Sequence, residues 1–436
     1  MKVSKIGFFI KKIIDSDEEK LQLKWIYIIA FVNTILGLFL IGWKELTDSR
    51  GYVAAFDVIC SGQLDVERTP VYPIFLGVIR AVVGSGLFYW VVVCVQSAVF
   101  LLSIRYFYRL VRLLGSQNCI TFLITIFYCL VPGLVSWNNA ILTESLAISG
   151  TVFLFYFAVN GWKKVHIGSL VSFGCSLFIL CMLRPSFLFL VPIFFCFWFI
   201  SLFVKGKKII ACYGLSGVVL TAVLVLCYCT CFQKTYGVFT PSSIGTLNQY
   251  CVARQRNLLN PDVIENAMLK VDIEKIILAG KGESVDLYYI EFGQLREKYS
   301  LLDIHSAVSS SVKSNFGKFL IETVQIAGEI KKWNLFDTYV TKPVVKLKMR
   351  ILYYFIAIYT FFLIIHICRN RKIPYLSLLV YVSGCGNLLF VLMGAQWEWT
   401  RLLTPSVPLF LLMFVQVINS LKVKVVIRRN ERFQLG

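Results

Sequence analysis

Apolar runs of about 20 residues recur along almost the whole chain, and short polar stretches separate them. A helix of about 20 apolar residues is long enough to cross the hydrocarbon layer of a bilayer. We therefore expect an all-α polytopic membrane protein with about ten transmembrane helices. The predicted spans cover residues 25–43, 86–104, 118–135, 141–159, 167–183, 185–203, 209–232, 351–367, 374–395 and 402–421.

Two longer segments interrupt this pattern. Residues 44–85 are mostly polar, except for an apolar stretch at 72–83 that is too short to cross and is expected to lie at the interface or to re-enter. Residues 233–349 are hydrophilic overall, but apolar residues recur at helical spacing between 304 and 324, which predicts a small helical domain.

These boundaries divide the chain into five parts. Residues 1–24 are expected to form an amphipathic segment on the inner surface, and residues 25–232 carry spans 1–7 with the first outer loop at 44–85. The helical domain follows at 233–349. Spans 8–10 occupy residues 350–421, and a basic tail occupies 422–436.

Basic residues follow alternate spans, which is the pattern that sets membrane orientation. The clusters are Arg105, Arg109 and Arg112; Lys163 and Lys164; Lys205, Lys207 and Lys208; Arg369, Arg371 and Lys372; and Lys422, Lys424, Arg428 and Arg429. We expect both termini to be cytoplasmic and the 44–85 loop and the helical domain to be extracytoplasmic. The predicted location is the plasma membrane, or the inner membrane of a bacterium.

Composition excludes several other classes of function. The residues are 58% hydrophobic and only 16% charged, so charge cannot cover a soluble globular surface. The net charge of +20 is distributed between spans, which favours membrane lipids rather than nucleic acid as partners. The chain has no Walker loop or dinucleotide-binding glycine pattern, so a cytosolic nucleotide site is not expected. An outward-facing enzyme would then need an activated substrate that is already in the membrane.

The first outer loop holds the first candidates for chemistry. Asp48 follows the end of span 1, and Tyr52 lies one helical turn further on. A carboxylate at the lipid boundary is partly desolvated, which is expected to raise its basicity and suits a general base. Arg68 precedes a turn stiffened by Pro70 and Pro73, where a guanidinium could grip a lipid phosphate or extend to the interface.

Three further candidates lie at the outer ends of later spans. Arg184 and Arg401 both precede proline-containing turns, and ionisable groups at such depth suggest function. Glu144 is in the first turn of span 4, a position that the helix dipole also favours for structural reasons. Cys60 and Cys251 both fall on the predicted outer face, which leaves a disulfide between them open.

Taken together, these motifs resemble the GT-C-fold glycosyltransferases that use a polyprenyl- or dolichyl-phosphate-linked sugar. The nearest likeness is to the protein mannosyltransferase and aminoarabinose-transferase-like group, across roughly the first 200 and the last 50 residues. The matching positions are Asp48, Tyr52, Arg68, Pro70 and Pro73, then Thr143-Glu144, Arg184-Pro185, and Arg401 with Pro405 and Pro408. Ser49 stands where some relatives have a second acid, so a divalent metal such as Mg or Mn is left unsupported.

The resemblance implies a fold, a reaction and roles for these residues. It implies an integral-membrane, inverting glycosyltransferase that moves a sugar from a polyprenyl-phosphate carrier to a glycan, lipid or protein acceptor. Asp48 would orient or deprotonate the acceptor hydroxyl. Arg68, with Arg184 or Arg401, would neutralise the departing phosphate, and Tyr52 and Glu144 would complete the substrate site.

Two other functions remain open at this stage. A polysaccharide polymerase or O-antigen ligase also has about ten spans and a large outer loop with arginines and histidine, which here makes His305 the residue to test. A transporter of lipid-linked glycans is the second alternative. Transporters usually show repeats and charges at the membrane midplane, whereas the charges here lie at the predicted outer rim.

Overall fold

A computed structural model describes residues 18–280, 285–336, 340, 347–395 and 398–434. The predicted amphipathic segment therefore lies outside the described residues up to position 17, and residues 19–24 belong to the first membrane helix instead. The described chain is helical, and its only β-type pairings are two isolated bridges, Lys44 with Ala140 and Asn334 with Lys348. The all-α prediction is confirmed for these residues.

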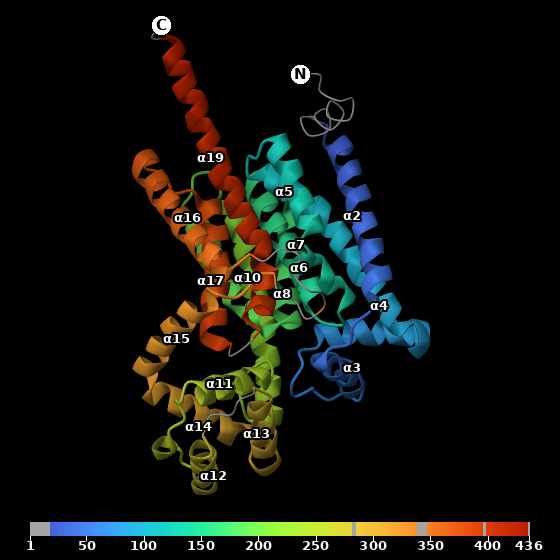
Figure 1. Ribbon diagram of the computed structural model, residues 1–436, viewed down its shortest axis with the longest axis vertical. Coiled ribbons are helices and arrows are strands. Elements are labelled where there is room, and N and C mark those ends of the chain that lie inside the picture. The colour runs from blue at the N-terminus through green and yellow to red at the C-terminus, as the bar shows by residue number, and fades with distance from the viewer. Residues whose placement is uncertain (1–17, 281–284, 337–339, 341–346, 396–397, 435–436) are drawn as a thin grey trace.

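Seven helical segments of the described chain are long and apolar enough to cross a membrane. They are α2 (Glu19–Ile41), α4 (Val71–Leu113), α7 (Glu144–Lys164), α10 (Lys208–Tyr236), α16 (Met349–Asn370), α17 (Tyr375–Gly394), and the run from α18 (Trp399–Leu403) through η4 (Thr404–Ser406) into α19 (Val407–Gln434). Figure 1 shows them packed as one bundle.

The remaining bundle helices are shorter or bent. The helix α5 (Asn118–Leu130) meets α6 (Pro132–Val135) and η1 (Ser136–Asn139) at a 56° bend, and this pair makes an eighth span if it counts as one. The other elements are α8 (Ile167–Leu183), η2 (Pro185–Phe189) and α9 (Leu190–Ser201). All ten predicted spans fall on helices, but the number that cross a membrane stays a prediction.

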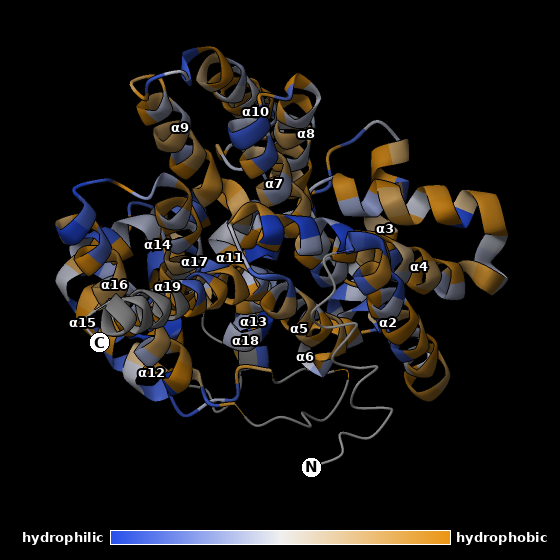
Figure 2. Ribbon diagram, turned by 90° about the horizontal axis from the view of Figure 1, so that it is seen from above, coloured by the Kyte–Doolittle hydropathy of each residue, from blue (hydrophilic) through white to orange (hydrophobic). Residues whose placement is uncertain are grey.

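Apolar side chains cover the outside of the bundle as well as its core. Large residues such as Phe39, Leu40 and Phe361 are 85%, 82% and 66% exposed. Figure 2 shows hydrophobic residues on the outward faces of the helices. A surface of this kind is stable only against lipid, so it supports the multi-pass prediction.

The predicted first outer loop is itself mostly helical. It contains α3 (Thr47–Cys60) and the beginning of α4, which changes direction at Gly84, where φ is +71°. Figure 1 shows the first part of α4 beside α3 and the rest rising through the bundle. This break explains why the sequence separates the stretch at 72–83 from span 2.

The segment between α10 and α16 forms a separate helical domain with its own hydrophobic core. Its elements are α11 (Ile244–Gln255), η3 (Pro261–Val263), α12 (Ala267–Leu278), α13 (Val285–Lys298), α14 (Leu301–Ser314) and α15 (Phe316–Ile330). The buried Arg256 ties it to the bundle, donating to the Thr323 hydroxyl at 2.8 Å and to the Leu392 carbonyl at 2.8 Å. A helical domain in this segment was predicted, and its extracytoplasmic location stays a prediction.

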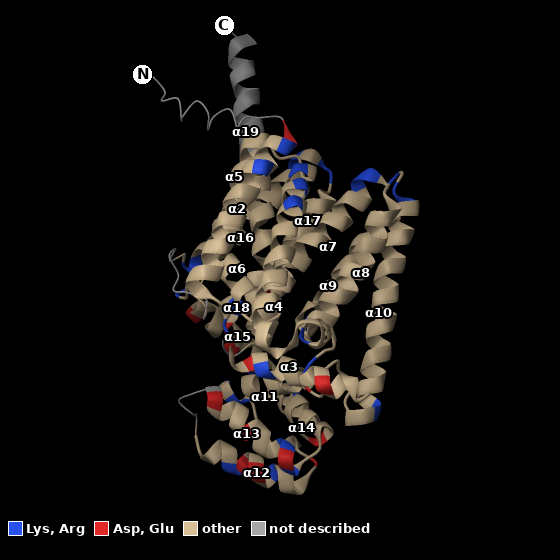
Figure 3. Cartoon of the chain, turned by 90° about the vertical axis from the view of Figure 1, so that its right-hand side faces the viewer, with Lys and Arg blue, Asp and Glu red and all other residues tan. Residues whose placement is uncertain are grey.

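Charge is distributed unevenly along the bundle. Figure 3 shows Lys and Arg gathered at the end where α19 leaves the bundle, whereas Asp and Glu lie mainly at the opposite end and on the helical domain. This asymmetry is the one that the positive-inside rule associates with a cytoplasmic face.

Packing between α3 and α4 depends on Gly77, because a Cβ atom there would lie 2.0 Å from the Phe56 ring. We expect Gly77→Ala to force the two helices apart and to lower the free energy of unfolding by about 1–3 kcal/mol, the usual cost of overpacking. Gly86→Ala, also in α4 but with no atom within 4 Å, is the matched control. Thermal unfolding of the two purified variants checks this, and equal melting temperatures would contradict it.

Candidate active site

The structure brings all six predicted site residues together at one end of the bundle. Asp48 and Tyr52 lie in α3, and Arg68 lies in the turn before α4. Glu144 is the first residue of α7, Arg184 is the C-cap of α8, and Arg401 lies in α18. Residues that are up to 353 positions apart in the sequence therefore form one ionic cluster.

Arg401 is the centre of this cluster and pairs with three carboxylates. Its Nε donates to Glu144 Oε1 at 2.5 Å, and its two terminal nitrogens donate to Asp48 Oδ2 at 2.9 Å and to Glu398 Oε2 at 2.8 Å. The Arg401 side chain is only 10% exposed. A buried guanidinium needs such partners, because an isolated charge in a low-dielectric environment is costly.

Arg68 holds the other oxygen of the Asp48 carboxylate. Its terminal nitrogen donates to Asp48 Oδ1 at 3.0 Å, and its guanidinium lies over the Tyr52 ring, 4.4 Å from the ring centre. Asp65 Oδ1 accepts from the backbone nitrogens of Glu67 and Arg68, at 2.9 and 2.6 Å, and so fixes the turn that presents Arg68. The spacing between Asp48 and Tyr52 thus places both side chains on the same arginine.

Glu144 links the two arginines that come from distant spans. The residue is fully buried, and its Oε1 accepts from both Arg401 and Arg184, with the Arg184 contact at 3.2 Å. Its second oxygen, Oε2, has no hydrogen-bond partner among the residues that the structure describes. Glu144 is therefore a member of the cluster and not only a favourable charge at a helix start.

The environment of Asp48 corrects one expectation from the sequence. Burial alone would raise the pKa of Asp48, but the positive charges of Arg401 and Arg68 outweigh it, so the pKa lies below its ordinary value. The prediction that desolvation makes Asp48 more basic is therefore wrong for this state of the protein. Both carboxylate oxygens are occupied by guanidinium groups.

Three residues that support the site were missed by the sequence analysis. Glu398 has left-handed backbone, with φ of 56°, and its burial raises its pKa despite the charge of Arg401. Asp65 shapes the Arg68 turn. Gln96 accepts from the Tyr72 hydroxyl at 2.9 Å and donates to the backbone carbonyls just before α7. Their roles depend on tertiary contacts, so no motif signals them.

Other side chains considered earlier lie elsewhere. His305 is in α14, where its Nδ1 lies 3.0 Å from the Thr246 hydroxyl, and its described hydrogen bonds include no residue of the ionic cluster. Cys60 and Cys251 are both free thiols, one exposed and one buried, so the disulfide left open by the sequence does not form here. In the described part of the chain, no group of His, Cys, Asp or Glu side chains has the arrangement of a metal site.

The comparisons with known proteins agree at the level of the fold. No protein-family model and no curated protein matches the sequence. One similar solved structure is the oligosaccharyltransferase AglB from the archaeon Archaeoglobus fulgidus, in complex with an inhibitory peptide and a dolichol-phosphate. The TM-score is 0.51 with 10% identity, over 94% of this chain and 52% of that one.

A second similar structure is the Archaeoglobus fulgidus oligosaccharyltransferase tethered to an acceptor peptide that contains the NVT sequon. It has a TM-score of 0.51 and 13% identity, over 93% of this chain and 51% of that one. The chain therefore spans about half the length of these enzymes. At such low identity the likeness concerns the fold alone, and it confirms that this chain has a GT-C-like membrane fold.

Proposed function

We propose that this protein is an integral-membrane glycosyltransferase that uses a sugar donor linked to a polyprenyl phosphate. The observation that carries the proposal is the ionic cluster, in which Asp48 is bound between Arg68 and Arg401 at 3.0 and 2.9 Å. A carboxylate can accept the proton of an acceptor hydroxyl, and several arginines at the end of membrane helices can stabilise a departing phosphate. The GT-C-like fold, which AglB shares, supports the same reaction class.

The arginines suit the charge that develops on the leaving phosphate. Guanidinium groups bind phosphate oxygens through directed pairs of hydrogen bonds. Arg68 Nε is buried and has no partner among the described residues, and Arg184 makes one ion pair, with Glu144. These two residues have donor capacity for a phosphate while Arg401 holds the carboxylates in place.

Binding of the phosphate would also change the state of Asp48. The cluster contains three arginines and three carboxylates, so its formal charges balance before the donor arrives. A phosphate that takes guanidinium contacts from Asp48 removes the positive charges that lower its pKa. The carboxylate then becomes more basic at the moment when a base is needed.

The proposed transfer step uses this arrangement. The acceptor hydroxyl oxygen bonds to the anomeric carbon on the face opposite the phosphate, and the carbon–oxygen bond to the phosphate breaks. The proton passes to the Asp48 carboxylate, and the bonding electrons leave with the phosphate oxygen, which inverts the configuration. Tyr52 keeps Arg68 in position through its ring. The sugar and the class of acceptor, whether glycan, lipid or protein, stay open.

The proposed orientation places this cluster on the extracytoplasmic face, with both termini in the cytoplasm. The unequal distribution of Lys and Arg supports it (Figure 3). The carrier lipid would lie in the same membrane as the protein, which is the plasma membrane or a bacterial inner membrane.

Asp48→Asn removes the proposed base while it preserves the shape of the side chain. We expect sugar transfer from lipid carrier to fall about 100-fold or more, the usual effect of losing a general base. Asp57→Asn is the matched control, because Asp57 lies in the same helix and pairs only with Arg80 among the described contacts. Radiolabelled transfer in membranes measures both, and near wild-type activity of Asp48→Asn would refute the assignment.

The pH dependence of sugar transfer should differ between the free and the donor-bound protein. Asp48 must be deprotonated, and its lowered pKa, caused by Arg401 and Arg68, keeps the free protein's carboxylate ionised at a more acidic pH than that of an ordinary aspartate. Once the phosphate binds, the pKa rises, so the acid limb of kcat should lie at a higher pH than that of kcat/KM. Steady-state measurements of kcat and kcat/KM against pH check which acid limb lies at the higher pH. If the acid limb of kcat lies at the lower pH, the phosphate does not take guanidinium contacts from Asp48.

His305 distinguishes the glycosyltransferase from a polysaccharide polymerase or O-antigen ligase, whose outer-loop histidine is expected to take part in the reaction. His305 contacts Thr246 and Ser309 and has no described hydrogen bond to the cluster, so we expect His305→Ala to retain transfer within about twofold. The same assay as above measures it. Complete loss of activity in a folded variant would favour the polymerase or ligase.

A further inference from the structure

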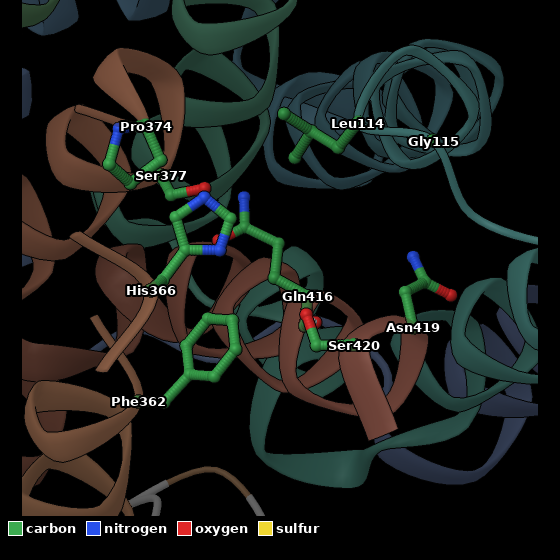
Figure 4. A pocket seen from close by; sticks show the side chains of 9 residues that line it. All are labelled: Leu114, Gly115, Phe362, His366, Pro374, Ser377, Gln416, Asn419 and Ser420. Atoms are coloured by element: carbon green, nitrogen blue, oxygen red, sulfur yellow. Dashed lines mark hydrogen bonds between the residues drawn. The ribbon is translucent and has the colours of Figure 1, made fainter. Parts of the chain in front are cut away.

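A polar pocket lies at the opposite end of the bundle from the ionic cluster. It has a volume of about 150 Å³ and lies between the end of α4, α16, α17 and α19. Figure 4 shows the side chains that line it: Leu114, Gly115, Phe362, His366, Pro374, Ser377, Gln416, Asn419 and Ser420. Gln416 follows Arg401 by 15 residues of mostly helical chain, which corresponds to about 20 Å along the bundle.

Gln416 gives this pocket a fixed and unused hydrogen-bond donor. The residue is 7% exposed, and its Oε1 accepts from the Tyr359 hydroxyl, which sets the orientation of the amide. The buried Nε2 has no partner among the described residues. Asn419 also lines the pocket and has an unpartnered amide oxygen, and an amide of this kind can present either its oxygen or its nitrogen. Buried polar groups without partners are rare in folded proteins.

The helix α17 begins at the same pocket. Its N-cap is Pro374, which provides no side-chain cap, and Ser377 lies in its first turn. The first backbone N–H groups of a helix have no partner within the helix, and together with the helix dipole they favour an anion. None of the nine lining residues is acidic. Arg371 and Lys372, which precede Pro374, are both exposed. The pocket therefore offers donors and positive potential.

We propose that this pocket binds the phosphate headgroup of an anionic membrane lipid. Its volume of about 150 Å³ is enough for a phosphate with a small polar substituent but not for acyl chains. The neighbouring surface suits those chains, because Phe361 and Ile364 of α16 are 66% and 53% exposed. Free inorganic phosphate shares the headgroup chemistry and is the other source of such a ligand. This site is independent of the proposed sugar transfer.

The test is native mass spectrometry of the full-length protein in detergent, titrated with phosphatidylglycerol. We expect Gln416→Met and Ser377→Ala each to weaken phosphatidylglycerol binding about tenfold, the usual effect of losing a hydrogen bond to a charged group. Ser216→Ala, at an exposed serine in α10, is the matched control and should bind as the wild type does. Ser377→Ala keeps the test valid if Gln416→Met fails to fold after losing the contact with Tyr359.

Two further titrations identify the source of the phosphate. Diacylglycerol with the same acyl chains lacks the phosphate and should not bind at the concentrations used. If millimolar inorganic phosphate instead displaces phosphatidylglycerol from the wild type but not from the same two variants, that result would support the site with free phosphate as its ligand. Equal binding of diacylglycerol, or unchanged phosphatidylglycerol binding in both folded variants, would overturn the proposal.

Discussion

The interaction on which the site depends is the pairing of Arg401 with three carboxylates. The guanidinium is almost entirely buried, and Asp48, Glu144 and Glu398 reach it from α3, from the start of α7 and from the residue before α18. Removal of one partner from a buried ion pair typically costs about 3–5 kcal/mol, since it leaves an uncompensated charge. The positions of these three elements relative to one another are therefore linked through one side chain.

The same pairing determines how the cluster could respond to a substrate. In a low-dielectric environment, unlike charges interact strongly, so Arg401 and Arg68 favour the ionised form of Asp48. A ligand phosphate carries the same sign as the carboxylates and competes with them for the same guanidinium donors. Binding of a phosphate can thus rearrange the ion pairs of a cluster whose formal charges are balanced beforehand. In the proposed reaction, these contacts of Asp48 would connect binding of the donor phosphate to the basicity of the carboxylate.

The rest of the fold supports this end of the bundle. Arg256 of the helical domain donates to the carbonyl of Leu392 near the end of α17, only a few residues before Glu398. On the other side, Gln96 of α4 bonds to the backbone at Asn138 and Ala140, which precedes Glu144. Helix ends expose unpaired carbonyl groups, and buried side chains satisfy them here. Arg256 therefore supports the segment that leads to Glu398, and Gln96 supports the segment that leads to Glu144.

The sequence by itself determined the helical class, the placement of the spans and the candidate residues. Hydropathy does this because each span must satisfy its own backbone and present apolar side chains to lipid. Positions at the outer ends of spans, proline-containing turns and the resemblance to GT-C glycosyltransferases selected Asp48, Arg68, Glu144, Arg184 and Arg401. Local patterns also separated the stretch at 72–83 from span 2, which Gly84 explains through its positive φ.

Only the tertiary structure decided how those residues act on one another. The sequence suggested that burial makes Asp48 more basic, and the structure shows the reverse, because two arginines from distant segments outweigh the burial. The helical spacing of apolar residues at 304–324 continues across two helices, because α14 ends at Ser314 and α15 begins at Phe316. Glu398, Asp65 and Gln96 were missed for the same reason. Pairwise electrostatics and packing depend on distances between segments, and hydropathy carries no information about those distances.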